Sequence, residues 1–415
     1  MGGGGREHAL VWKLLQSPRL KELYVAPGNG GTAAVAHNLD IPPTDMDALA
    51  RAAEQYKIDL TVVGPEAPLA SGIVDLFQSR GLTIFGPTRA ATPIESSKVF
   101  AKELMRRHGI PQAGGTVFSS LSEAKQFVER HPFPLVIKAD GLAAGKGTVV
   151  AKSPHEALQA LSDMLEKRVF GAAGDKVIVE ECLQGREVSF LAFTDGKSVI
   201  PMAPACDYKR AYDGNQGPNT GGMGSYCPPG FFDQQQIEQA QRSILEPVVQ
   251  AMNKEGKPFK GVLYAGLMLT TDGVKVLEFN ARFGDPETQV ILPRLKTDLV
   301  EILWAVVHGT LDKIKIEWSD DACVGVVMAS GGYPGTYKTG FPITGLDRLN
   351  KDILVFHAGT KAVPEGIPCT DGGRVITVAG CGKTIAEARA KIYANIASIH
   401  FENCHYRRDI ATEAS

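Results

Sequence analysis

The chain has 415 residues, of which 44% are hydrophobic and 22% charged, and its formal net charge is -2. This length and hydrophobic share predict roughly two to four domains with buried cores. The near-neutral charge and the lack of a long basic block argue against nucleic acid as a bulk electrostatic partner.

Cysteine and histidine spacing gives no metal or disulfide pattern. The seven cysteines include no CxxC pair, and the nine histidines include no HExxH motif. A zinc site and a disulfide framework are therefore not expected. No run of roughly 18 apolar residues occurs, and the N-terminus has no basic region followed by an apolar one. We expect a soluble, cytoplasmic protein without a membrane partner.

The first 93 residues alternate short apolar strands with helical patterns, which predicts a parallel α/β sheet. Strands are expected at 23–25, 60–63 and 83–85, and helices at 45–56 and 73–80. The loops that follow these strands should face one pocket, because the carboxyl ends of parallel strands form the ligand crevice of such a sheet. Each loop taken singly is equally compatible with an ordinary turn.

The chain starts with a glycine run, Gly2 to Gly5, followed by Arg6-Glu7-His8 and an apolar helical pattern. Such a loop can present backbone amides and a helix N-terminus to a phosphate. It normally follows a strand, and none precedes it in this sequence. A disordered start or residual cloning sequence is the alternative.

The middle of the chain combines a glycine-rich hairpin with an acidic strand end. The hairpin at 141–147 follows a strand at 135–138, and its spacing is not that of a Walker loop. Small residues let backbone approach a polyphosphate, while Lys138 and Lys146 supply charge. A second strand ends at Glu180-Glu181 and resumes at Glu187, where exposed backbone could pair with an adenine edge. A flexible surface hairpin and solvated acids are the alternatives.

Residues 277–287 read LEFNARFGDPE, which is the most informative run. Strand alternation places Glu278 and Asn280 on one face. A carboxylate and an amide carbonyl are ligands that Mg²⁺ accepts, with water and nucleotide phosphates in its other positions. Arg282 follows, and its planar donor fork could hold a carboxylate or a phosphoryl group. An ordinary strand with a charged turn could explain Glu-Phe-Asn alone, but it is disfavoured for the whole run.

The last part of the chain, from about residue 318, predicts apolar strands at 323–330, 353–358 and 374–379 and a helix at 387–399. A packing domain without chemistry is one interpretation of this part. Completion of a substrate cleft is the other.

The order of glycine-rich hairpin, acidic strand end and LEFNAR is similar to the ATP-grasp ligases, in which two lobes close on ATP. Within that superfamily the chain resembles the glycinamide ribonucleotide synthetases, or phosphoribosylamine-glycine ligases, over nearly its whole length. The motifs that carry the resemblance are GGREHAL at 4–10, APGNGG at 26–31, VGPEAPL at 63–69, ADGLAAGKG at 139–147, DYKRAYDG at 207–214, GPNTGGMGSYCP at 217–228, LEFNARFGDPE at 277–287 and GGRV at 372–375.

The resemblance implies a ligase that joins glycine to 5-phosphoribosylamine with ATP and Mg²⁺ or Mn²⁺, the second step of de novo purine biosynthesis. Glycyl phosphate is the implied intermediate, because a carboxylate needs a better leaving group than oxide before an amine can attack. The implied fold is mixed α/β and α+β and multidomain. It has an N-terminal parallel α/β domain (1–93), an ATP-grasp domain (94–317) with a mobile lid at about 113–179, and a small C-terminal α+β domain (318–415). We expect a monomer.

The resemblance also assigns site residues one by one. The nucleotide set comprises Lys98, Lys138, Gly145, Lys146 and Gly147 at the phosphates, Glu180, Glu181 and Leu183 at the adenine, and Glu187 at the ribose. The metal set comprises Glu278 and Asn280. The catalytic set comprises Arg282, Asp207, Lys209 and Asn219. The substrate set comprises Gly3, Gly4, Gly5, Gly64, Pro65, Glu66, Thr220, Gly221, Gly222 and Arg374.

Two departures from the family pattern have consequences. The strand before LEFN reads Tyr264-Ala265-Gly266-Leu267-Met268 and lacks the second metal-binding acid of many ATP-grasp enzymes. The first strand is missing, so we expect unsatisfied neighbours, a loosely held glycine loop and weak phosphoribosylamine binding beside normal ATP binding. A restored strand should raise stability and activity.

Two rival functions remain. An ATP-grasp carboxylase would lack DYKR and GPNTGGMG, which are both present. A catalytically dead nucleotide-binding protein is conceivable because of the missing strand.

Overall fold

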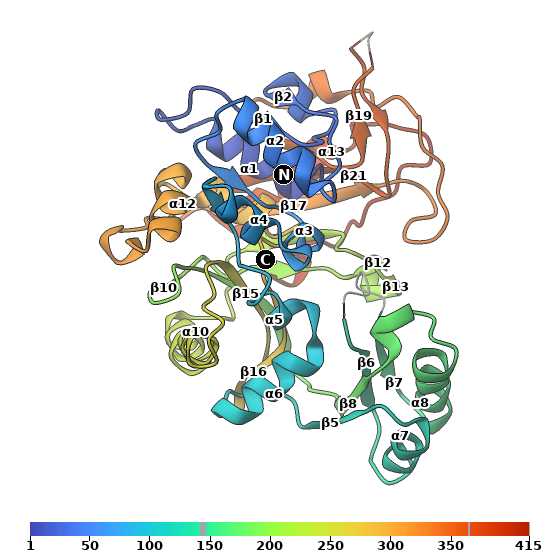
Figure 1. Ribbon diagram of the computed structural model, residues 1–415. Coiled ribbons are helices and arrows are strands. Elements are labelled where there is room, and N and C mark those ends of the chain that lie inside the picture. The colour runs from blue at the N-terminus through green and yellow to red at the C-terminus, as the bar shows by residue number, and fades with distance from the viewer. Residues whose placement is uncertain (142–146, 364–365, 415) are drawn as a thin grey trace.

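The structure is a computed structural model, and it describes residues 1–141, 147–363 and 366–414. The N-terminal and C-terminal parts of the chain pack together in the upper half of Figure 1, above the parts that the sequence predicts to be the ATP-grasp body and its lid. The predicted fold class is confirmed: several α/β and α+β units are present, each with its own hydrophobic core. Across the described ranges, no helix is long and apolar enough to cross a membrane.

The N-terminal part contains two parallel strand pairs, β1 with β2 and β3 with β4, and the predicted strands and helices are present there. Its core includes Leu49, Ile73 and Phe77, each at most 4% exposed. The elements are α1 (Gly5–Leu14), β1 (Tyr24–Val25), η1 (Thr32–Ala34), β2 (His37–Asn38), α2 (Met46–Gln55), β3 (Thr61–Val62), α3 (Glu66–Ser71), α4 (Ile73–Ser79) and β4 (Ile84–Phe85).

Met1 and Gly2 connect the two parallel pairs. The Met1 amino group donates to the Val62 carbonyl oxygen at 2.8 Å, and the Gly64 amide donates to the Met1 carbonyl oxygen at 3.1 Å. On the other side, the Gly2 amide donates to the Ala26 carbonyl oxygen at 2.7 Å. The expectation of a loosely held glycine loop is therefore wrong for this backbone, because two residues suffice to pair with both neighbouring strand ends.

The lid has an antiparallel sheet in the order β5-β8-β6-β7, covered by α7 and α8. Ile137, Leu161 and Val179 are fully buried in a core of its own, separate from the core of the body. A separate core lets a unit keep its fold while it moves against its neighbour. The elements are β5 (Gly115–Phe118), α7 (Leu121–Val128), β6 (Leu135–Ala139), β7 (Thr148–Ala151), α8 (Pro154–Leu161), η2 (Ser162–Glu166), η3 (Gly171–Gly174) and β8 (Val177–Glu181).

The body is a four-stranded antiparallel sheet in the order β10-β9-β15-β16, with α6, α9 and α10 packed on its apolar face. Two further helical segments, α11 with η6 and α12 with η7, share a second hydrophobic core with this sheet and with Cys323 of the C-terminal part. The elements are α5 (Pro93–Ser96), α6 (Lys98–His108), β9 (Arg186–Thr194), β10 (Val199–Pro201), α9 (Gln234–Ala240), η5 (Gln241–Leu245), α10 (Glu246–Lys254), β15 (Gly261–Thr270), β16 (Gly273–Asn280), α11 (Thr288–Ile291), η6 (Leu292–Arg294), α12 (Leu299–His308) and η7 (Leu311–Lys313).

The C-terminal sheet has the order β11-β14-β17-β21-β18, so two of its strands come from the middle of the chain. This pairing brings the loops between β11 and β14 to the edge of the ATP-grasp sheet. The elements are β11 (Cys206–Asp207), β12 (Arg210–Tyr212), η4 (Asp213–Asn215), β13 (Gln216–Asn219), β14 (Gly224–Cys227), β17 (Ala322–Ala329), η8 (Leu346–Arg348), β18 (Leu354–His357), β19 (Thr360–Lys361), β20 (Cys369–Thr370), β21 (Arg374–Gly382), α13 (Ile385–Ile396) and η9 (Thr412–Ala414).

Candidate active site

A β-bulge in β16 decides which way Glu278 points. Gly266 pairs with Glu278 but the next residue, Leu267, pairs with Val276, so Leu277 is the extra residue of the bulge. Val276 is 2% exposed in the core, whereas Glu278 is exposed on the opposite face. Without the bulge, strict alternation would turn Glu278 into the core together with Val276.

Glu278 is an ionised carboxylate among positive charges. Desolvation alone would raise its pKa, but Lys209, Lys138 and Lys98 hold the pKa below its ordinary value, with a smaller contribution from Arg282. Within the described parts of the chain, Glu278 forms no direct ion pair. The arrangement suits a carboxylate that shares its surroundings with a bound cation and phosphates.

The ligand set for a divalent ion is small. No group of three or more His, Cys, Asp or Glu side chains suited to a metal occurs among the described residues. Glu278 and Asn280 nevertheless offer hard oxygen atoms on one strand face, and Mg²⁺ or Mn²⁺ commonly takes its other ligands from water and phosphate. These two side chains fit such an ion.

Two of the residues predicted to bind the nucleotide, Lys138 and Glu180, form an ion pair with each other. Lys138 forms an ion pair with Glu180 and donates to the Leu277 carbonyl oxygen at 2.9 Å. Lys102, which the sequence did not single out, binds the other oxygen of Glu180 at 2.9 Å. Glu180 is 5% exposed, and its backbone lies in the middle of the sheet, opposite Gly115 on β5 and Val136 on β6.

Other predicted nucleotide residues lie around this group. The Glu181 carboxylate accepts from the Gly114 amide at 2.7 Å, and Leu183 follows β8. The Lys98 ammonium donates to the Gly141 carbonyl oxygen at 3.0 Å. The carbonyl oxygen of Gly147, at the far side of the hairpin, accepts from the Ala139 amide at 2.8 Å, whereas the predicted Gly145 and Lys146 lie outside the described residues.

Asp207 and Lys209 lie beside the predicted ribose contact. Lys209 Nζ donates to Glu187 Oε2 at 2.6 Å, and both side chains are about half exposed. Burial raises the pKa of Asp207 to about 7; Lys209 opposes the shift, while Glu287, Glu187 and Glu278 add to it. Asp207 therefore changes its protonation near neutral pH.

Arg282 is held between two carboxylates from different segments. Its Nε lies 2.9 Å from Glu66 Oε2 on α3 and 3.2 Å from Glu95 Oε1 on α5. Glu95 also accepts from the Ala281 amide at 2.8 Å, and Asn280 Oδ1 accepts from Arg282 Nη2 at 3.3 Å. Burial raises the pKa of Glu95. At Glu66 desolvation also acts to raise the pKa, but Arg282, Arg6 and hydrogen bonds together lower it.

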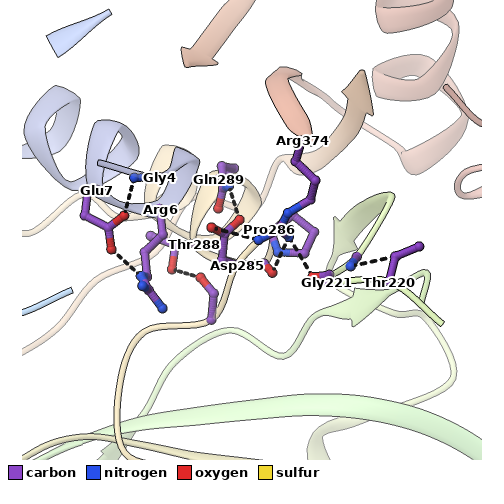
Figure 2. A network of polar contacts seen from close by, with 12 residues as sticks. Gly4, Arg6, Glu7, Thr220, Gly221, Asp285, Pro286, Thr288, Gln289 and Arg374 are labelled. Carbon is purple, nitrogen blue, oxygen red and sulfur yellow. Dashed lines mark hydrogen bonds and ion pairs between the residues drawn. The ribbon is translucent and has the colours of Figure 1, made fainter. Parts of the chain in front are cut away.

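Arg374 joins the C-terminal sheet to two loops of the site (Figure 2). Its Nη1 donates to the Gly221 carbonyl oxygen at 2.6 Å and to the Asp285 carbonyl oxygen at 2.9 Å, and its Nη2 lies 3.2 Å from the Asp285 carboxylate. Desolvation acts to raise the pKa of Asp285, but Arg374, Arg6, Gln289 and Arg282 together lower it. Gly222 has φ +113° and a Cβ there would lie 2.4 Å from the Pro286 ring, so only glycine fits at this position.

The rest of the 219–224 loop has mixed roles. The Thr220 amide and hydroxyl donate to the Lys209 carbonyl oxygen at 2.7 and 2.9 Å, which fixes this loop beside Lys209. Asn219 ends β13, pairs with Arg210 across the hairpin, and is exposed. The structure thus brings Thr220 into the site network but leaves the Asn219 side chain at its rim.

The glycine loop at Gly2 to Gly5 lies against the side-chain carboxylate of Glu7. The Gly4 amide donates to Glu7 Oε2 at 2.6 Å, and Arg6 Nε donates to Glu7 Oε1 at 2.6 Å (Figure 2). A Cβ on Gly64 would lie 2.0 Å from Glu7 Oε1, so a larger residue there would have to displace the Glu7 carboxylate. Gly3 accepts from the Asn29 side chain at 3.0 Å, while Gly5 begins α1 and Pro65 precedes α3.

Sequence reasoning missed several residues that the fold places in the site. Glu287 is 3% exposed and accepts from Ser189 at 3.0 Å and Tyr264 at 2.5 Å. Its position in the GDPE run was the available signal. Glu95 and Lys102 had no such signal, because their partners lie far away in sequence.

Comparisons with known proteins agree along the whole chain. Family models described as phosphoribosylglycinamide synthetase match the N domain at residues 1–95, the ATP-grasp (A) domain at 96–288 and the C domain at 323–413. The phosphoribosylamine--glycine ligase of Halalkalibacterium halodurans is 51% identical over 414 residues, covering 100% of this chain and 96% of that protein. The trifunctional purine biosynthetic protein adenosine-3 of Gallus gallus is 49% identical over 100% of this chain, which spans 42% of that protein.

Solved structures give the same result. The phosphoribosylamine--glycine ligase of Thermotoga maritima is similar with a TM-score of 0.86 and 33% identity, covering 99% of this chain and 98% of that one. The biotin carboxylase domain of the Hydrogenobacter thermophilus 2-oxoglutarate carboxylase shares the fold with a TM-score of 0.74 at 16% identity, covering 98% of this chain and 90% of that one. The chain belongs to the phosphoribosylglycinamide synthetase family.

Proposed function

We propose that this protein is an ATP-dependent ligase that joins glycine to 5-phosphoribosylamine and releases glycinamide ribonucleotide, ADP and phosphate. The observation that carries the proposal is the face of β16, where Glu278 lies among Lys98, Lys138 and Lys209 and close to Arg282. This charge pattern suits a polyphosphate and a transferring phosphoryl group. Family membership and the names of the relatives support the same reaction.

The first chemical step would be phosphoryl transfer to glycine. A carboxylate oxygen of glycine attacks the γ-phosphorus of ATP, the bond to ADP breaks, and glycyl phosphate forms. Lys98 and Lys138 are proposed to neutralise the nucleotide phosphates, and Arg282 the transferring group. The hinge at Glu180, Glu181 and Leu183 is proposed to hold the adenine.

A divalent ion, Mg²⁺ or Mn²⁺, would be held by Glu278 and Asn280. When bound, it would supply further neutralisation of the phosphates. The exposed carboxylate of Glu278, and the lack of a cluster of three or more His, Cys, Asp or Glu side chains among the described residues, support a site completed by water and substrate oxygens.

The second step would be attack by the ribosylamine nitrogen on the acyl carbon of glycyl phosphate, with phosphate as the leaving group. Asp207 and Lys209 are proposed to hold the ribosylamine, together with Gly64, Glu66 and the loop at Gly3 to Gly5. With a pKa near 7, Asp207 suits a proton acceptor for the attacking amine. Arg374 is proposed to set the 219–224 loop against the acyl phosphate through its bonds to Gly221 and Asp285.

The setting of the enzyme is proposed from its cysteines and its fold. All seven cysteines are free, which favours a reducing compartment, and we propose that the protein acts as a monomer in the cytoplasm.

The deciding experiment measures ADP release with phosphoribosylamine generated in situ. Release should require both glycine and the ribosylamine. A carboxylase would instead require bicarbonate, and a binding protein without activity would release no ADP above background. The variant Glu278→Gln should lose activity, whereas Asp272→Asn, which removes a charge from the exposed turn of the same hairpin, should not.

A further inference from the structure

Three cysteines from distant parts of the chain lie in one row across the C-terminal sheet. Cys227 on β14 is directly opposite Cys323 on β17, and Cys323 is directly opposite Cys381 on β21. Residues directly opposite each other in antiparallel strands project from the same face. The three thiols are therefore neighbours although the sequence contains no CxxC pair.

The three thiols differ in access and in charge. Cys227 and Cys323 are fully buried, whereas Cys381 is partly exposed to solvent. The Cys323 thiol lowers the pKa of Cys381, desolvation and Asp321 oppose it, and Arg294 and Lys391 lower it further. Burial and the neighbouring Cys381 raise the pKa of Cys323. Cys381 is therefore a partly exposed thiol with a lowered pKa beside a buried thiol with a raised pKa, which is the arrangement of a redox-sensitive cysteine pair.

The remaining cysteine of the row has a different partner. Arg294 Nη1 donates to Cys227 Sγ at 2.9 Å and so holds this thiol on the buried side of the row. Outside the row, burial raises the pKa of Cys206 and of Cys404 to about 12 in each case, which disfavours their thiolates. Within the row, the pair suited to oxidation is therefore Cys381 with Cys323.

We propose that Cys381 and Cys323 are a reversible oxidation site that forms a cross-strand disulfide when the protein meets a peroxide. Directly opposed Cα atoms lie about 4.5–5.5 Å apart, which falls inside the range of about 4.4–6.8 Å for disulfides. The strands thus need little movement to close the bond.

The chemistry balances with hydrogen peroxide as the oxidant. The Cys381 thiolate attacks one peroxide oxygen, the O–O bond breaks, and the departing hydroxide takes a proton to become water, leaving a sulfenic acid on Cys381. The Cys323 sulfur then attacks the Cys381 sulfur, the S–O bond breaks, and the leaving hydroxide takes the proton of Cys323. Two thiols are oxidised, and one peroxide is reduced to two waters.

The disulfide would act as a staple away from the candidate active site. Arg374 begins β21 and Cys381 is near its end. At about 3.3 Å per residue, seven residues of strand separate them by roughly 20 Å. The bond would also join two strands that are far apart in sequence, and this lowers the conformational entropy of the unfolded chain. The fold should gain resistance to unfolding under oxidising conditions.

The test treats the reduced full-length chain with hydrogen peroxide, caps the remaining thiols, and maps the disulfides by mass spectrometry of a digest. The expected result is one peptide pair joining Cys323 and Cys381, loss of two of the seven thiols, and a melting midpoint a few degrees higher that returns to its original value with a thiol reductant. The Cys381→Ser variant should lose both the linked pair and the shift in melting. The matched Cys404→Ser variant should keep both.

Several outcomes would overturn the proposal. They are a disulfide between Cys227 and Cys323, a disulfide between chains, oxidation of Cys381 to a sulfinic acid without a link, and retention of all thiols. If Cys381→Ser fails to fold, the disulfide map of the unsubstituted chain still decides the question.

Discussion

Glu95 is expected to act as a positioning residue for Arg282, and Glu95→Gln tests this role. The glutamine keeps an oxygen that can accept from the Ala281 amide, at 2.8 Å in the structure, but removes the charge that faces Arg282 Nε at 3.2 Å. Glu66 remains as a second partner at 2.9 Å. Exchanging a charge-assisted contact for a neutral one costs about 1–2 kcal/mol. If Arg282 must be held for phosphoryl transfer, kcat falls by about 5- to 30-fold.

The stability of the Glu95→Gln variant should stay the same or rise, although its kcat falls. Burial raises the pKa of Glu95 above its ordinary value, so the folded protein keeps this proton at pH values where the unfolded chain has released it. The stability contributed by this group is therefore present below the ordinary carboxyl pKa and is lost as the pH rises towards the raised value. Glutamine never ionises and removes this penalty, so the melting midpoint near neutral pH should be unchanged or higher.

The assay measures kcat, the KM of each substrate and the melting midpoint of Glu95→Gln beside Glu103→Gln. Glu103 is a half-exposed acid of α6, 3.8 Å from Arg107, and its substitution should change none of these values. A Glu95→Gln variant with unchanged kcat would refute the positioning role. A loss of kcat accompanied by an equal loss of stability would show a merely structural one.

Three further predictions concern the metal ligand Glu278, the contact in which the His357 amide of the C-terminal part donates to His8 Nδ1 at 2.8 Å, and the loop network around Arg374. Glu278→Gln should lower kcat by about 100-fold while calorimetry shows an ATP Kd within about threefold, because charge builds up at the transferring phosphoryl group; equal losses of both would contradict the metal role. Burial lowers the pKa of His8 to about 3 and of His357 to about 4, so stability should fall as the pH drops below the ordinary histidine value, by up to about 1.4 kcal/mol per pH unit for each. In denaturant titrations at several pH values, His8→Gln should weaken the fall in stability at low pH, whereas substitution of the exposed His155 by Gln should leave it unchanged. If both variants lose stability equally at low pH, the fall does not come from His8. Arg374→Lys keeps the charge but loses the fork that binds Gly221 and Asp285, so the loop should sit less firmly against the acyl phosphate and kcat should fall about 10-fold with ATP affinity unchanged. An unchanged kcat would disprove the loop-setting role.

The sequence by itself determined the local elements and the chemistry that they carry. The predicted strands and helices of all parts are present, because hydrophobic periodicity and glycine or proline breaks act over a few neighbouring residues. The run at 277–287 placed Glu278, Asn280 and Arg282 together for the same reason. The family resemblance, which the comparisons confirm, rested on ordered motifs that can be recognised one by one.

The tertiary structure decided which distant segments meet. Only the bulge at Leu277 turns Glu278 away from the side of the buried Val276, and only strand pairing moves β11 and β14 into the C-terminal sheet. Glu95 reaches the Ala281 amide across 186 positions of sequence. Hydrophobic periodicity cannot predict contacts such as that between Glu95 and Ala281. They form when separate elements pack together, and they produce no repeating pattern in the sequence.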